Sequence, residues 1–201
     1  MEINFILSII ILLLSVALHE VSHGYVADRL GDPTAKLAGR LTLNPLKHLD
    51  MVGSIVVPTI TFLVGGLIIG WAKPVPYNPY NLRDQRWGEA KVAFAGPLSN
   101  LIIALVFGLA IRFDLASTSL LMPITLIVFI NIILAIFNLM PIPPLDGSKI
   151  LFSFLPYRYL NFRVFLERYS LFLIIFFVFF LWQFLLPLTT FLFYIMTGLA
   201  I

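Results

Sequence analysis

His19-Glu20-Val21-Ser22-His23 lies inside residues 3–27, a stretch that is otherwise apolar enough to cross a membrane as a single helix. On a helix the two histidines stand at positions i and i+4, about 6 Å apart along the axis, and point off one face. Two neutral imidazoles placed in this way can share a divalent metal ion, and a neighbouring carboxylate can act as a general base. Ionisable groups are costly in apolar surroundings and mark functional sites there, so the motif predicts a metal site within the membrane.

The composition places the chain among integral membrane proteins. Its 201 residues are 60% hydrophobic and only 11% charged, with a mean hydropathy of +1.01. A water-soluble domain of this length could not cover so much apolar surface. The net charge of +3 is small and forms no basic patch interleaved with aromatic residues, which argues against nucleic acid as a partner. Because the chain has no cysteine, the metal ligands must come from His, Asp and Glu.

The apolar segments predict an all-α membrane protein, a polytopic helical bundle in a single domain over residues 1–201. They lie at 3–27, 52–70, 92–111, 120–137, 169–186 and 188–201. Since a spanning helix needs about 20 apolar residues, we expect about five or six transmembrane helices in the lipid bilayer.

Lysine and arginine gather in the connecting segments 28–51, 72–91 and 147–168. The positive-inside rule places all three segments in the cytoplasm. Both flanks of 52–70 then lie on one side of the membrane, so we expect a re-entrant segment near 52–76 that enters and returns. With this topology the HEVSH turn and the end of helix 120–137 meet near the cytoplasmic side.

A catalytic zinc site uses three protein ligands and an open position for water, so the two histidines need a third ligand. The candidates are His48 and the carboxylates. Asp146 stands out among them because it follows residues 138–145, which contain three prolines, and precedes Gly147. We expect the prolines to end the preceding helix and to hold an extended backbone. The alternative is that Asp146 only caps the helix that follows.

HEVSH in an apolar helix, followed by NLMPIPPLDG at 138–147, resembles the site-2 protease family of intramembrane zinc metalloproteases. The resemblance extends to residues 39–45, 47–50, 71–76 and 94–100. It covers a catalytic core at roughly residues 5–156, leaves C-terminal helices at 165–201, and is similar to the compact prokaryotic branch.

The resemblance implies one Zn²⁺ per chain, bound by His19, His23 and Asp146. It also implies that Glu20 activates the attacking water and that Asn138 helps to hold the substrate backbone or its oxyanion. The expected activity is hydrolysis of peptide bonds within or near a transmembrane segment of another protein. The expected location is a prokaryotic cell membrane, which the chain crosses several times.

Two other polar residues are candidates for a supporting role. His48 could be a zinc ligand or could polarise the substrate, but we favour a supporting or structural role, such as pairing with Asp50. Asn100 belongs to an i+4 row with Gly96, Ala104 and Gly108, for which we expect close packing against the HEVSH helix. Asn100 is expected to form a hydrogen bond across that contact.

The main alternative is a non-proteolytic zinc-binding membrane protein or transporter. A transporter needs polar residues that lead across the bilayer from both sides, whereas the outer half of the first helix offers only Asn4 and Ser8. A transporter or a scaffold would also have no use for Glu20 beside the ligands. The sequence therefore favours a protease.

Overall fold

The computed structural model describes residues 2–50, 53, 56 and 73–199. Within these residues the elements are α1 (Glu2–Arg29), α2 (Thr34–Leu37), η1 (Pro45–His48), η3 (Pro79–Asn81), α4 (Gly88–Arg112), α5 (Thr118–Asn138), α6 (Asp146–Phe154), η4 (Tyr157–Tyr159), α7 (Leu160–Arg168), α8 (Ser170–Phe176), η5 (Phe177–Leu181) and α9 (Trp182–Thr197). Every one is helical, which confirms the all-α prediction for the described part. The expected re-entrant segment falls mostly outside the described residues.

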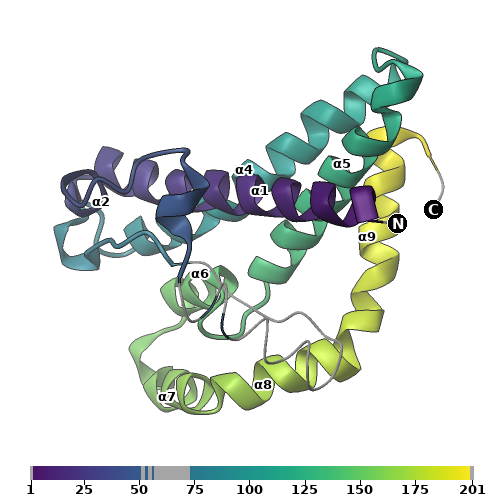
Figure 1. Cartoon of the computed structure of the whole chain (residues 1–201). Helices are drawn as coiled ribbons and strands as arrows, with labels where there is room; N and C mark the ends of the chain where they lie inside the picture. Colours follow the sequence, from purple (N-terminus) through teal and green to yellow (C-terminus); the bar gives the residue numbers. More distant parts are fainter. Residues whose placement is uncertain (1, 51–52, 54–55, 57–72, 200–201) are drawn as a thin grey trace.

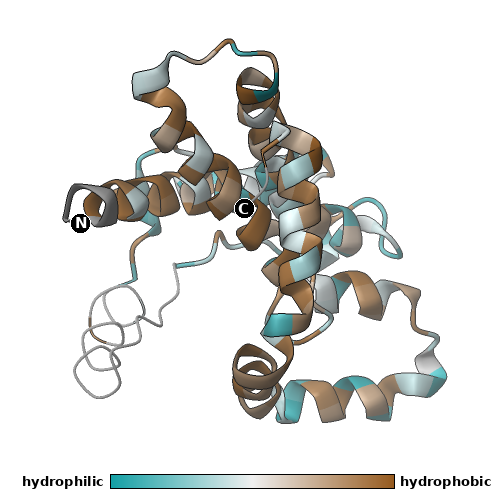
Figure 2. Cartoon of the chain, turned by 90° about the vertical axis from the view of Figure 1, so that its right-hand side faces the viewer, coloured by the Kyte–Doolittle hydropathy of each residue, from teal (hydrophilic) through white to brown (hydrophobic). Residues whose placement is uncertain are grey.

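Among the described residues, four helical stretches are long and apolar enough to cross a membrane: Ile6–Arg29, Gly88–Arg112, Thr118–Asn138 and Ser170–Thr197. Figure 2 shows apolar residues along the length of these helices. Ser170–Thr197 is one continuous helical stretch that joins the apolar segments expected before and after Pro187, because Pro187 lies inside α9 without ending it. Membrane helices tolerate proline when neighbouring groups satisfy the freed backbone. The break expected at Pro187 is therefore absent.

This C-terminal stretch bends at the π-helical turn η5. Figure 1 shows α8 along the bottom of the view and α9 rising from its end toward α4 and α5. Phe193 of α9 is fully buried in a cluster with residues of α4 and α5, namely Ala104, Ile111, Val128, Ile132 and Ile136. The close packing of α4, α5 and α9 forms the main apolar core.

A buried line of polar side chains joins α1, α4 and α5. Asn100 donates from Nδ2 to Oδ1 of Asn131 at 2.8 Å, and Asn131 donates from Nδ2 to the hydroxyl of Ser15 at 2.9 Å. Both asparagines are fully buried. In apolar surroundings each unpaired amide would be costly, so these hydrogen bonds fix how the three helices meet.

Asp32 ties the end of α1 to the segment that precedes α4. Its carboxylate accepts hydrogen bonds from the backbone of Asn78 at 2.6 Å, the side chain of Asn81 at 2.8 Å and the backbone of Thr34 at 3.2 Å. Burial raises the pKa of this carboxyl, but the hydrogen bonds outweigh burial and hold the pKa below its ordinary value. Asp32 thereby anchors one end of the non-helical residues 73–78 beside α1.

Candidate metal centre

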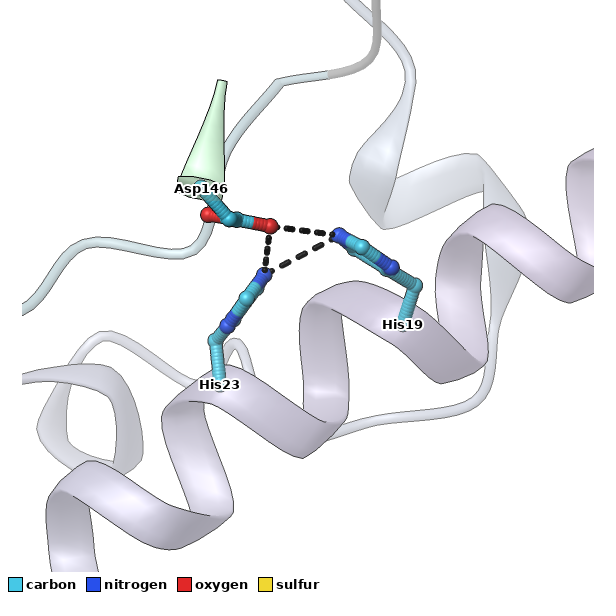
Figure 3. Close-up of side chains that lie close together, drawn as sticks. All are labelled: His19, His23 and Asp146. Atoms are coloured by element: carbon cyan, nitrogen blue, oxygen red, sulfur yellow. Dashed lines mark hydrogen bonds and ion pairs between the residues drawn. The ribbon is translucent and has the colours of Figure 1, made fainter. Parts of the chain in front are cut away.

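His19 and His23 project from one face of α1 toward Asp146, the first residue of α6 (Figure 3). The His19 Nε2 and His23 Nε2 atoms lie 3.0 Å apart. Oδ2 of Asp146 lies 3.1 Å from the former and 3.0 Å from the latter. All three residues are buried, and they form the one such cluster of His and acidic residues found in the described part of the chain. The structure thus brings together the three residues that the sequence singled out.

The turn before α6 carries Asp146 to this position. α5 ends at Asn138, and the chain then folds through short-range backbone hydrogen bonds, from Ile142 to Met140 at 2.8 Å and from Leu145 to Ile142 at 2.9 Å. The expected extended backbone at 138–146 is therefore wrong: the prolines end the helix, but local turns fold the segment back.

Gly147 lets α6 begin against the end of α5. A Cβ atom at this position would lie 2.1 Å from the carbonyl oxygen of Leu139. Leu145, not Asp146, occupies the N-cap position of α6, and it makes no side-chain capping bond. The carboxylate of Asp146 is consequently directed at the histidines instead of serving as the helix cap.

Hydrogen bonds at Nδ1 decide the tautomer of both imidazoles. The Nδ1 atom of His23 lies 2.7 Å from the carbonyl oxygen of Val92, which can only accept, so Nδ1 carries the proton. The Nδ1 atom of His19 lies 2.6 Å from Oδ1 of Asn100. The orientation of the Asn100 amide therefore determines which ring nitrogen of His19 carries the proton.

The polar line through Asn131 fixes that amide. Asn131 donates from Nδ2 to the carbonyl of Ile127 at 2.8 Å, so its Oδ1 must be the atom that accepts from Nδ2 of Asn100. Oδ1 of Asn100 then faces His19 and accepts its Nδ1–H. Both histidines are left with the lone pair of Nε2 directed at the carboxylate.

This arrangement fits a cation. With both Nδ1 atoms protonated, His19 Nε2, His23 Nε2 and Asp146 Oδ2 are three acceptors that face one another at 3.0 to 3.1 Å. Acceptors this close repel one another unless a positive charge lies between them. Two imidazole nitrogens and one carboxylate oxygen form a donor set that binds divalent metal ions. The other oxygen, Oδ1 of Asp146, lies 3.5 Å from Nζ of Lys149.

Gly96 makes room for the two imidazoles. A Cβ atom there would lie 2.4 Å from Nε2 of His23 and 2.6 Å from Cε1 of His19. Gly96 and Asn100, the first two residues of the i+4 row on α4, thus face α1 as expected. The last two do not: Ala104 belongs to the α4–α5–α9 core, and Gly108 packs on Met196 of α9.

The remaining predicted residues lie as follows. Glu20 accepts a hydrogen bond on Oε2 from the backbone amide of Val75 at 2.8 Å and is not in the ligand cluster. Asn138 donates from Nδ2 to the carbonyl of Leu134 in its own helix at 2.9 Å. His48 is buried, donates from Nε2 to the carbonyl of Thr42 at 2.8 Å, and lies outside the cluster.

Of the groups that set the tautomers, the sequence pointed to Asn100, whose hydrogen bond to the HEVSH helix was expected, but not to the carbonyl of Val92 or to Asn131. The carbonyl of Val92 carries no signal in the sequence, because every residue has one. The sequence does mark Asn131, because apart from Thr125 it is the one strongly polar residue between 120 and 137. A lone asparagine in an apolar helix calls for a buried partner.

Replacing Gly96 by alanine is expected to push the imidazoles apart, because its Cβ atom would overlap both rings. We predict a fall of about 10- to 100-fold in metal affinity, similar to the loss of groups that orient metal ligands, measured by competition with a chelator. Gly108→Ala is the matched control, because a Cβ atom there would contact Met196 of α9 and neither histidine. Wild-type metal affinity in Gly96→Ala would contradict this description of the site.

Comparison with known proteins assigns the chain to a family. The model of peptidase family M50 matches residues 7–116 and 111–181. "Putative zinc metalloprotease YwhC" of Bacillus subtilis is 40% identical over 158 residues, which cover 74% of this chain and 68% of YwhC. "Putative zinc metalloprotease Rip2" of Mycolicibacterium smegmatis is 37% identical over 145 residues, which cover 71% of this chain and 55% of Rip2.

A third relative, "Zinc metalloprotease MJ0392" of Methanocaldococcus jannaschii, is 28% identical over 153 residues, which cover 75% of this chain but 34% of that protein. The chain therefore spans between about a third and two thirds of the length of these relatives. No solved structure matches. The family match extends over both histidines, Glu20 and Asp146, and the chain belongs to peptidase family M50.

Proposed function

We propose that this protein is an intramembrane zinc metalloprotease, which hydrolyses peptide bonds within or near transmembrane segments of other membrane proteins. The observation that carries the proposal is the convergence of three buried acceptor atoms on one point, beside a glutamate, among helices apolar enough to lie in a membrane. Membership in family M50 and the names of the relatives support it. We further propose that residues 1–201 act as a single membrane domain.

The ligand geometry is compatible with zinc. Donor atoms about 2.0–2.1 Å from a common tetrahedral centre stand roughly 3.3 Å apart, and the three contacts here measure 3.0, 3.0 and 3.1 Å. His19, His23 and Asp146 would hold the ion and leave a fourth position open. When bound, zinc supplies a Lewis acid that polarises a carbonyl and lowers the pKa of water.

Glu20 is the proposed general base. Its Oε2 atom is held by the amide of Val75, while Oε1 has no hydrogen bond to the described residues. Oε1 is therefore the oxygen available to take a proton from water and to pass it to the leaving amine. Asn138 is proposed to hold the substrate backbone through the groups of its amide that the hydrogen bond to the carbonyl of Leu134 does not use.

A transmembrane helix hides its carbonyl groups in its own hydrogen bonds, so the substrate must unwind locally before a carbonyl can reach the site. The buried position of the ligands, each 5–7% exposed, keeps bulk water away. We propose that the substrate is a membrane helix that can be opened at the cytoplasmic edge, where His19 and His23 lie in the second half of α1.

Replacing Glu20 by glutamine separates catalysis from metal binding. Because Glu20 lies outside the ligand cluster, we expect Glu20→Gln to keep its zinc while peptide cleavage falls about 10²- to 10⁴-fold. Zinc content by mass spectrometry and cleavage of a labelled transmembrane substrate measure the two properties. Glu167→Gln, on the exposed α7, should change neither. Near-normal cleavage by Glu20→Gln would contradict the role of Glu20 as the general base. A wild type that binds zinc but cleaves no substrate would favour the alternative function, a transporter.

Labelling of single cysteines tests the cytoplasmic placement of the site. In the native chain, which has no cysteine, we expect Lys36→Cys and Arg83→Cys to react with an impermeant thiol reagent from the cytoplasmic face. Ser117→Cys, in the turn between α4 and α5 at the other end of these helices, should react from the opposite face (Figure 1). Labelling of Lys36→Cys and Arg83→Cys from opposite faces would refute the re-entrant topology.

A further inference from the structure

Residues 73–77, Lys-Pro-Val-Pro-Tyr, lie beside α1 at the level of Glu20. Pro74 and Pro76 have no backbone N–H, so Val75 offers the only amide donor among these three residues. This donor is directed at Oε2 of Glu20 at 2.8 Å, and Val75 is 5% exposed. The amide of Val75 thus donates to the proposed base, Glu20, and cannot pair with a substrate strand at the same time.

Gly24 shows how closely this segment approaches α1. It lies at i+4 from Glu20 and shares its face of the helix. A Cβ atom at Gly24 would lie 2.8 Å from Cγ1 of Val75 and 2.6 Å from Cδ2 of Leu41. Two segments, one containing Leu41 and the other Val75, therefore pack on α1 at the turn that follows Glu20.

Arg40 joins these two segments. Its Nη2 donates to the carbonyl of Lys73 at 2.9 Å and, more weakly, to that of Pro74 at 3.4 Å. Its Nη1 donates to the carbonyl of Lys47. The amide of Lys73 in turn donates to the carbonyl of His48 at 2.8 Å. The planar guanidinium thus holds residues 73 and 74 against the 40–48 segment.

We propose that Arg40 is a positioning residue for the peptide hydrolysis, which acts through the amide of Val75 to orient the carboxylate of Glu20. The inference rests on the proposed function, because it assigns a task only if Glu20 is the base. Arg40 fixes the two residues before Val75, and the amide then fixes Oε2. Fixing one oxygen leaves Oε1 turned toward the attacking water and satisfies a charged group that is only partly solvated.

The alternative is that Arg40 only stabilises the loop. Two residues that act through the same hydrogen bond lose their effect together, whereas two independent structural defects add. The proposal therefore predicts that Val75→Pro, which removes the donor, and Arg40→Gln, which releases residues 73 and 74, are not additive. Val75→Ala is the matched control, since it removes the side chain and keeps the amide.

The experiment measures kcat, KM, zinc content and thermal stability of full-length protein in detergent, with a labelled transmembrane substrate. We expect kcat to fall about 10- to 100-fold in Val75→Pro and in Arg40→Gln, the effect of one hydrogen bond to a charged group, with KM and zinc content unchanged. The double variant should be no slower than the slower single variant. Arg40→Lys should rescue little, because a single compact ammonium lacks the planar fork of two separated nitrogens with which the guanidinium reaches both segments. Val75→Ala, which keeps the amide, should lose less kcat than Val75→Pro, and the exposed Arg86→Gln should keep wild-type kcat.

The outcomes separate the two proposals. A wild type that does not cleave, or a Glu20→Gln variant that does, would refute the proposed function itself. If the wild type cleaves and Glu20→Gln does not, wild-type kcat in Arg40→Gln or additive losses in the double variant would refute the role of Arg40. Should Val75→Pro lose zinc or fail to fold, Arg40→Gln and Arg40→Lys decide alone, and normal turnover in either would overturn the proposal.

Discussion

Three acceptor atoms that face one another across about 3 Å inside an apolar bundle are the constraint on which the rest of this structure depends. The two Nε2 atoms are acceptors because both Nδ1 atoms carry the proton, which they donate to the carbonyl of Val92 and to the side chain of Asn100. Asn100 is oriented in turn by Asn131, and Asn131 by the carbonyl of Ile127. The candidate metal site is therefore specified by hydrogen bonds that extend from α1 through α4 into α5.

This specification has consequences for packing. The backbones of α1 and α4 must approach closely enough for Asn100 to reach His19, and Gly96 is the position where a larger residue would collide with the histidines. A second close approach, at Gly24, brings the segment around Val75 onto α1 beside Glu20. The two histidines and the proposed base are thus adjacent on α1 but are held by different parts of the chain, so the proposed zinc binding and proton transfer can be altered separately.

Much of the site could be predicted from the sequence, for identifiable reasons. HEVSH places both histidines on one helical face by geometry alone, and Asp146 stood out because the prolines before it mark the end of a helix. The turn at 139–145 was predicted less well, because proline excludes a helix without choosing between an extended backbone and local turns. The tautomer of His23 depends on a backbone carbonyl, which no sequence pattern marks, and the continuation of α9 through Pro187 depends on neighbouring groups that satisfy the freed backbone.

X-ray absorption at the zinc edge of the purified protein tests the central claim most directly. Zinc bound by His19, His23 and Asp146 should show nitrogen and oxygen neighbours at about 2.0–2.1 Å and the outer-shell scattering of two imidazole rings. Asp146→Ala should keep both imidazoles and lose an oxygen neighbour or the metal itself. The chain contains three histidines, so a third imidazole in the spectrum would have to come from His48. That result, or an Asp146→Ala spectrum identical to the wild type, would contradict the site described.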